Sequence, residues 1–157
     1  MENDLFKDYV RIPKPQAFHH EPDPNINIKS TGSTKKYIAY GAKLLINEKF
    51  PKISLTASGN AVNKALITAD ILRKKIKGLS QINEIKSKEV EDEFQAKNSD
   101  QIKIKIMKNL AILEIILSNE NNLDESHYGY QPPLSIEKIK EFGTTFLPKE
   151  GNLFNFF

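Results

Sequence analysis

The sequence predicts an α/β fold in which a small mixed sheet carries two helices, a two-layer sandwich. Segments in which apolar and polar residues alternate, as in half-buried strands, take turns with segments whose apolar residues recur every three or four positions, as in helices. Over residues 26–118 the order is strand, helix, strand, helix, strand, strand. Helices that alternate with strands pack on the sheet and bury its apolar face. With 157 residues, the chain is long enough to bury such a core.

The first half of the domain holds two strand–helix units. The first strand is predicted at 26–30 and its helix at 34–49. The second strand is predicted at 52–58, and its helix at 60–77, before Gly78, which suits a helix C-terminus.

The second helix is predicted to bury one stripe and to offer another to a partner. Ile67 and Ile71 fall on the face that carries Lys64 and Lys75. Since isoleucines left in water among cations are costly, a partner subunit is expected to cover this face. Cover by the N-terminal arm or the aromatic C-terminus is the alternative. The core stripe has a helical period and comprises Val62, Ala65, Leu66, Ala69, Leu72 and Ile76.

The second half of the domain reads as two strands. The first is predicted at 81–90, and an acidic loop, EDEFQAKNSD, follows at 91–100. The last strand region, 102–118, contains the nearly continuous apolar run LAILEIIL. Such a run is typical of a central strand buried on both faces.

Two flanking segments lie outside this domain. Residues 1–25 are expected to form an arm without regular elements, because four prolines interrupt it. Residues 119–157 form a C-terminal extension with a turn-rich stretch, a short helix at 135–142 and an aromatic end. The prolines are Pro13, Pro15, Pro22 and Pro24, and the terminal aromatics, which fit a groove or fray, are Phe154, Phe156 and Phe157.

Positive charge is concentrated in one segment. Eleven basic and two acidic residues lie between Lys29 and Lys77, so this segment carries +9, and the remainder carries −6 to give +3 in all. Segregated positive charge is the footprint of a polyanion-binding protein. A lysine-rich, solvated surface is the alternative.

Several function classes find no support. The chain has no cysteine, which excludes disulfides, cysteine-based zinc sites and a thiol nucleophile. His19 and His20 lie in the proline-rich arm without further ligands, and nucleotide-binding glycine loops are missing. The longest apolar stretch, 110–118, is too short to span a membrane. We therefore expect a soluble intracellular protein with no catalytic residue, no metal and no cofactor.

Two loops lead from a strand into a helix, Thr31-Gly32-Ser33-Thr34 and Ser58-Gly59-Asn60-Ala61. Free N–H groups at a helix start favour anions, and glycine permits close approach of the backbone. Lysines follow each loop. These loops are candidate phosphate contacts.

The stretch SGNAVNKALITADILRKKIKGLSQI, residues 58–82, resembles the signature of the Alba superfamily, and IKSTGSTKKYIAYGAKLL is similar to its first strand, basic loop and first helix. Downstream, NLAILEIILSNENNLDESHYGYQPP resembles the larger Alba-type protein subunit of eukaryotic nuclear ribonuclease P and ribonuclease MRP. The resemblance covers about residues 26–133. It implies a fold like the C-terminal domain of a bacterial initiation factor.

The resemblance also implies a role without catalysis. Such a subunit pairs with a smaller Alba-type subunit, joins other ribonuclease P/MRP proteins and grips a stem of the catalytic RNA. Its processes are tRNA 5′ maturation and pre-rRNA processing, in the nucleus and nucleolus. Two alternatives stay open: a free Alba homodimer on chromatin or mRNA, which includes DNA among its ligands, and an enzyme with an unrecognised site.

Charge, loops and resemblance together give a set of predicted RNA contacts. Three positions depart from the family pattern: Thr34 stands where a lysine is usual, Asn60 replaces a basic residue, and Ser80 replaces a histidine. The predicted contacts are Lys29, Gly32, Ser33, Lys35, Lys36, Gly59, Asn60, Lys64, Arg73, Lys74, Lys75 and Gln81.

Overall fold

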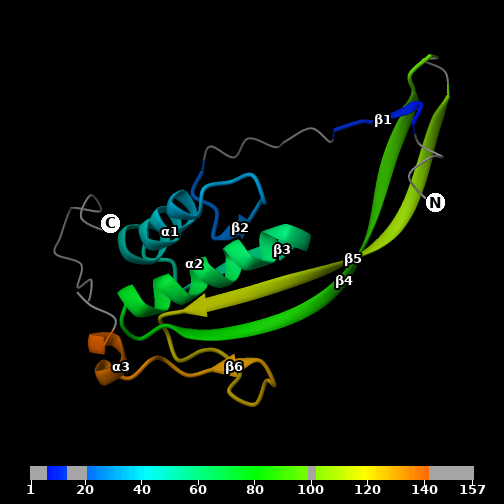
Figure 1. Ribbon diagram of the computed structural model, residues 1–157. Coiled ribbons are helices and arrows are strands. Elements are labelled where there is room, and N and C mark those ends of the chain that lie inside the picture. The colour runs from blue at the N-terminus through cyan, green and yellow to red at the C-terminus, as the bar shows by residue number, and fades with distance from the viewer. Residues whose placement is uncertain (1–6, 14–20, 99–101, 142–157) are drawn as a thin grey trace. The chain divides into compact units, whose positions relative to one another are not determined.

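The computed structural model describes residues 7–13, 21–98 and 102–141, which form the elements shown in Figure 1. These residues fall into two units, one of 21–86 with 112–141 and one of 7–13 with the described part of 87–111. The strands are β1 (Tyr9–Arg11), β2 (Asn25–Asn27), β3 (Lys52–Ser58), β4 (Ser80–Ala96), β5 (Lys103–Ser118) and β6 (Tyr130–Gln131). The helices are α1 (Thr34–Ala42), α2 (Val62–Lys75) and α3 (Ile136–Glu141).

The larger unit is a two-layer α/β sandwich, as predicted. β2 runs parallel to β3, with Ile26 opposite Leu55. β5 runs antiparallel to β3, and β4 follows β5 in the sheet. α1 and α2 pack against each other on one face of this sheet (Figure 1). The core lies between the two layers and includes Ile38, Leu44, Leu55, Leu72, Ile115 and Leu117.

The prediction that β5 is buried on both faces was wrong. The strand is central, and Ile115 and Leu117 are fully buried beneath the helices. Glu114 and Ile116, which alternate with them, are only half-buried. Both helices cover the same face, so the other face of the strand has no second layer from these helices.

The core stripe of α2 also differs from the prediction at one position. Leu66 is 41% exposed, whereas Thr68 is fully buried among the core residues. The Thr68 hydroxyl donates a hydrogen bond to the Lys64 carbonyl oxygen at 2.7 Å. Because its polar group is satisfied within the helix, threonine can occupy a core position that the apolar pattern assigns elsewhere.

Helix boundaries are shorter than predicted. α1 ends at Ala42 and continues as a π-helical turn, Lys43–Asn47, after which Lys49 takes a φ of 55° and the helix stops. A 3₁₀ turn, Gly59–Ala61, precedes α2. The aromatic end and the His19–His20 pair lie outside the described residues.

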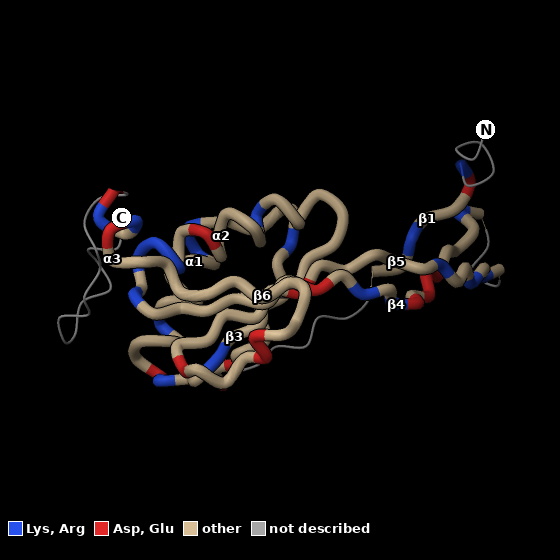
Figure 2. Tube along the Cα trace, turned by 90° about the horizontal axis from the view of Figure 1, so that it is seen from below, with Lys and Arg blue, Asp and Glu red and all other residues tan. Residues whose placement is uncertain are grey.

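The smaller unit is a hairpin of β4 and β5 to which β1 adds a strand. β1 pairs antiparallel with β4, and Val10 lies opposite Gln95. Two predictions were wrong here: the arm contains a strand, and the acidic loop at 91–100 belongs largely to β4. The strand, Tyr9–Arg11, ends before Pro13, the first proline of the arm, so the prolines do not interrupt it. The acids are stabilised across strands, since the Lys105 ammonium group lies 3.0 Å from the Glu91 carboxylate. Figure 2 shows acidic and basic positions together in this hairpin.

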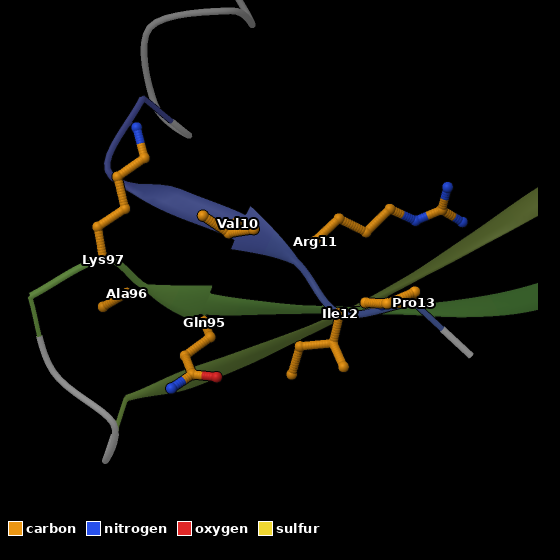
Figure 3. A pocket seen from close by; sticks show the side chains of 7 residues that line it. All are labelled: Val10, Arg11, Ile12, Pro13, Gln95, Ala96 and Lys97. Carbon is orange, nitrogen blue, oxygen red and sulfur yellow. The ribbon is translucent and has the colours of Figure 1, made fainter. Parts of the chain in front are cut away.

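Asp92 joins β1 to both hairpin strands. Its side chain is only 7% exposed and accepts from Arg11 of β1 at 2.6 Å and from Lys108 of β5 at 2.7 Å. The hydrogen bonds from Lys108 and Arg11 hold the pKa of Asp92 below its ordinary value. Beside this contact lies a hollow of about 360 Å³ (Figure 3), lined by Val10, Arg11, Ile12, Pro13, Gln95, Ala96 and Lys97.

We predict that Asp92→Asn loosens β1 from the hairpin, because the amide removes the charge that Arg11 and Lys108 share. Amide hydrogen exchange at Val10 and Ile12 should accelerate, while Glu89→Gln, an exposed site on the same strand, should change nothing. Because the pKa of Asp92 is lowered in the folded chain, its carboxylate contributes stability to the attachment of β1 at pH values above the ordinary pKa of 3.8. This contribution is lost as the pH falls through the lower pKa of the folded chain. Equal exchange in the wild type and Asp92→Asn contradicts this.

Candidate nucleic-acid interface

Both predicted phosphate loops lie at the same edge of the sheet. β2 and β3 are parallel, so the chain leaves both strands at the same end before each helix begins. The Lys64 ammonium group on α2 reaches across and donates to the carbonyl oxygens of Ser30, at 2.5 Å, and Gly32, at 2.7 Å. Lys64 thus holds the first loop against the start of α2. We call residues 29–36 and 58–64 the two-loop surface.

Tyr37 shapes the first of these loops. Its hydroxyl oxygen accepts from the Lys29 backbone N–H at 2.9 Å. A Cβ at Gly32 would lie 2.0 Å from that same oxygen, so a larger residue there would displace the Tyr37 ring from this position. Gly32 was predicted as an RNA contact. The structure shows that the packing of Tyr37 also favours glycine at this position.

The second loop is open. Gly59 has a φ of +55°, which favours glycine, and nothing lies within 4 Å of the position of a Cβ there. Asn60 is exposed beside it. Neither Ser33 nor Ser58 caps the following helix with its side chain. The N–H groups at these helix starts therefore face the loop surface, where they suit an anion.

Lysines surround the two loops. Lys29, Lys35 and Lys36 are exposed, the last two on the first turn of α1. Exposed cations next to helix N-termini add positive charge beside the N–H donors. The two-loop surface can therefore bind phosphate groups through both.

The basic end of α2 forms a separate cluster. α2 has 14 residues, so its ends are about 20 Å apart. Lys74 pairs with Asp70 at 2.7 Å, and Lys75 is half-buried. Apart from Gln81, the predicted RNA contacts are thus divided between the two-loop surface and this distant cluster.

The Arg73 side chain contacts the C-terminal extension of its own chain. Its guanidinium donates to Gln131 Oε1 at 2.8 Å and to the Pro132 carbonyl oxygen at 2.5 Å. Burial lowers the pKa of Arg73, while Asp70 raises it. The side chain fastens the C-terminal extension to α2, a role that sequence reasoning missed.

The contacts of Arg73 and the pairing with β4 explain the pentapeptide Gly-Tyr-Gln-Pro-Pro at 129–133. A Cβ at Gly129 would lie 2.0 Å from the Asn83 carbonyl oxygen, so the backbones approach as only glycine allows. Tyr130 and Gln131 form β6 against β4. Gln81, predicted as an RNA contact, lies opposite Gln131 and is 5% exposed, so in this arrangement it belongs to the sheet.

The outward apolar face of α2 differs from the prediction. Ile67 is 49% exposed in the single chain, as expected for a residue that a partner subunit covers, and Leu66 is exposed beside it. Ile71 packs partly against the core of its own chain. The exposed apolar side chains on the outward face of α2 are therefore those of Leu66 and Ile67.

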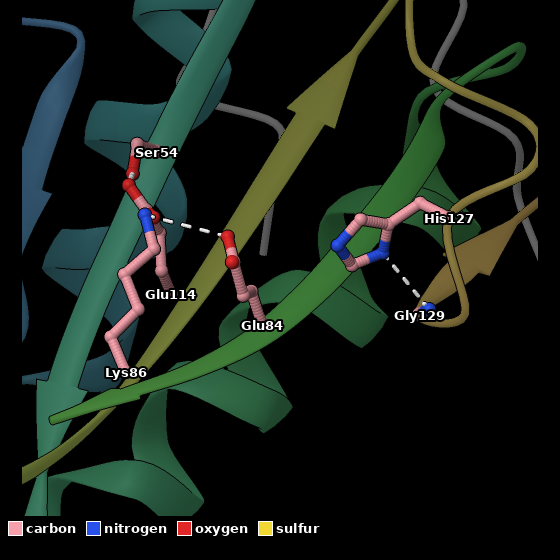
Figure 4. A network of polar contacts seen from close by, with 6 residues as sticks. All are labelled: Ser54, Glu84, Lys86, Glu114, His127 and Gly129. Carbon is pink, nitrogen blue, oxygen red and sulfur yellow. Dashed lines mark hydrogen bonds and ion pairs between the residues drawn. The ribbon is translucent and has the colours of Figure 1, made fainter.

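On the uncovered face of the sheet, one lysine pairs with two glutamates (Figure 4). Lys86 pairs with Glu114 and, at 3.4 Å, with Glu84, while the Ser54 hydroxyl donates to Glu114 at 3.1 Å. The hydrogen bond between Lys86 and Glu114 raises the pKa of the lysine and lowers that of the glutamate. This face offers no surplus of positive charge among the four groups.

Over the described part of the chain, no group of three or more histidine and acidic side chains is placed to hold a metal ion. Nor does any helix there have the length and apolar character needed to cross a membrane.

Residues 24–89 match the family model described as Alba. The chain contains an Alba domain. It is 36% identical over 119 residues to the DNA/RNA-binding protein ALBA1 of Plasmodium falciparum, covering 76% of this chain but 48% of that protein, so it spans about half of that relative. It is 24% identical over 128 residues to the ribonuclease P protein subunit p25-like protein of Bos taurus, covering 79% of this chain and 78% of that protein.

Two further likenesses are weaker. Ribonuclease P protein subunit p25 of Rattus norvegicus is 23% identical over 119 residues, 69% of this chain and 59% of that protein. Alba from Thermoplasma volcanium has a TM-score of 0.40 at 21% identity, over 60% of this chain and 98% of that one. The matched Alba region contains the two-loop surface and α2, whereas Arg73 extends its contacts beyond that region to Gln131.

We predict that Arg73→Ala destabilises the fold. Losing charged hydrogen bonds to Gln131 and Pro132 should lower the free energy of unfolding by about 1.5–3 kcal/mol, measured by urea denaturation, and should speed exchange at Tyr130. Lys74→Ala, which removes an exposed i,i+4 ion pair, should cost about 0.5 kcal/mol or less. If both variants unfold like the wild type, Arg73 does not anchor the extension.

Proposed function

We propose that this protein is a non-catalytic RNA-binding subunit that grips the phosphate backbone through the two-loop surface. The observation that carries the proposal is the pair of loops joined by Lys64, with exposed lysines and uncapped helix starts at one edge of the sheet. Such contacts read charge and shape rather than base sequence. Binding should fall steeply as the salt concentration rises.

The assembly we favour is a nuclear ribonuclease P/MRP-type particle, in which the chain forms half of an Alba heterodimer and acts in tRNA and pre-rRNA processing. Two observations support it. The p25-like relative aligns along most of both chains, and the Gly-Tyr-Gln-Pro-Pro segment, on which the resemblance rests, is built into the fold through Arg73. The catalytic RNA would supply the chemistry.

A second candidate is a free Alba dimer on RNA or DNA, which the higher identity to ALBA1 favours. A tagged pull-down from the native cells separates the two. One or two abundant structured RNAs with a smaller Alba-type partner and cleavage of tRNA precursors support the particle. A broad spread of mRNA or genomic DNA with self-association supports the free dimer.

We predict that Lys35→Glu combined with Lys36→Glu weakens RNA binding while the fold remains intact. Each lost phosphate contact should reduce the slope of log K against log salt by about 0.7–0.9, measured by filter binding from low to high salt. Lys138→Glu with Lys140→Glu, an equal charge reversal at exposed positions of α3, is the control. Unchanged affinity in the first variant removes this loop from the site.

We predict that Ile67→Asp disrupts pairing but not folding, because the side chain is half exposed in the single chain and a charge is costly once a partner covers it. Light scattering of the complex should show loss of the paired mass with an unchanged melting temperature. Asp70→Asn, on the exposed surface of the same helix, should pair normally. Retention of the paired mass by Ile67→Asp would exclude this face as the interface.

A further inference from the structure

The turn before β6 presents an aromatic pair that the function above does not use. Tyr128 is 83% exposed, and its ring stacks on that of His127 with centroids 4.5 Å apart and planes 26° from parallel. One face of the tyrosine ring thus contacts a neighbour while most of the side chain remains in water. Much of the ring is therefore accessible to a ligand that stacks on it.

The turn holds this pair in place by a set of short-range hydrogen bonds. The Asp124 carboxylate accepts from the Ser126 N–H at 2.9 Å and from the Ser126 hydroxyl at 2.6 Å. His127 Nδ1 accepts from the Gly129 N–H at 3.0 Å (Figure 4). The His127 carbonyl oxygen accepts from the Tyr130 N–H at 2.9 Å. The turn then joins the sheet where Gly129 lies against Asn83.

A ring that is fixed before binding loses little conformational entropy when a ligand stacks on it. The neighbours also indicate what that ligand is. Glu125, Ser126 and Asp124 are polar, so the turn lacks the contiguous apolar patch of a protein interface core. Carboxylates repel phosphate, yet they accept hydrogen bonds from the amino groups of bases.

We propose that Tyr128 is a stacking platform for one unpaired base of the bound RNA, with His127 as the residue that positions it. The proposal rests on the RNA binding proposed above and adds a base contact to the phosphate contacts of the two-loop surface. Unpaired bases splayed from loops and bulges stack on aromatic side chains in this way. The platform selects RNA with an unpaired base over a continuous stem.

The test uses the full chain and two RNAs, a stem with an internal loop that carries 2-aminopurine and the same stem fully paired. Tyr128→Ala should lose about 5- to 100-fold in affinity for the looped RNA and the fluorescence quenching of stacking, with no change on the paired stem. Tyr128→Phe should retain both, and Tyr128→Leu, which keeps bulk without a ring, should behave like alanine. Because the side chain is exposed, all three should melt like the wild type.

The Lys35→Glu, Lys36→Glu variant separates the two proposals, since it should weaken binding to both RNAs. If it does so while Tyr128→Ala binds the looped RNA like the wild type, the platform is refuted and RNA binding stands. If the wild type binds neither RNA, both proposals fail. Normal RNA binding by Tyr128→Ala, with reduced affinity for the smaller Alba-type subunit, also overturns the platform and makes Tyr128 a protein contact.

Discussion

The parallel pairing of β2 with β3 is the constraint on which the functional surface depends. Parallel strands require a crossover, which α1 provides, and they release the chain at the same edge of the sheet. The two loops therefore lie side by side although about 27 residues separate them. Lys64 then fixes the first loop by two carbonyl contacts. Lys64 was predicted as a phosphate contact, and in the structure it organises the backbone of the first loop.

The C-terminal extension completes the domain. β6 pairs with the start of β4, at an edge of the sheet that would otherwise present unpaired N–H and carbonyl groups. Arg73 supplies the other attachment, and a half-buried guanidinium needs the acceptors that Gln131 and Pro132 provide. This mutual requirement links α2, which lies in the matched Alba region, to a segment outside it. The same contacts attach the turn that carries Tyr128 to the rest of the domain.

Much of the fold could be predicted because strand and helix periods differ, and the order of elements then limits the topology. The failures have identifiable causes. Thr68 is buried because its hydroxyl bonds within the helix, which hydrophobicity does not register. The stretch 91–100 is acidic, yet most of it forms β4 because Arg11, Lys105 and Lys108 neutralise it from remote positions. For the candidate site, the sequence predicted two loops that lead from a strand into a helix, and the structure places both at one edge of the sheet. The roles of Arg73 and Gln81 could not be predicted, because they depend on a partner strand far along the chain.

The distribution of charge favours a polymer as the ligand. In the hairpin and on the uncovered face of the sheet, Lys86, Lys105 and Lys108 pair with acids. The segment from Lys29 to Lys77 has only two acids, so its excess of positive charge lies on the loops and helices. Exposed members of this excess, Lys29, Lys35 and Lys36, flank the first loop, whereas at the far end of α2 Lys74 pairs with Asp70 and Arg73 bonds to the C-terminal extension. Two adjacent loops with exposed lysines offer contacts to several phosphates, which suits a continuous backbone better than a single nucleotide.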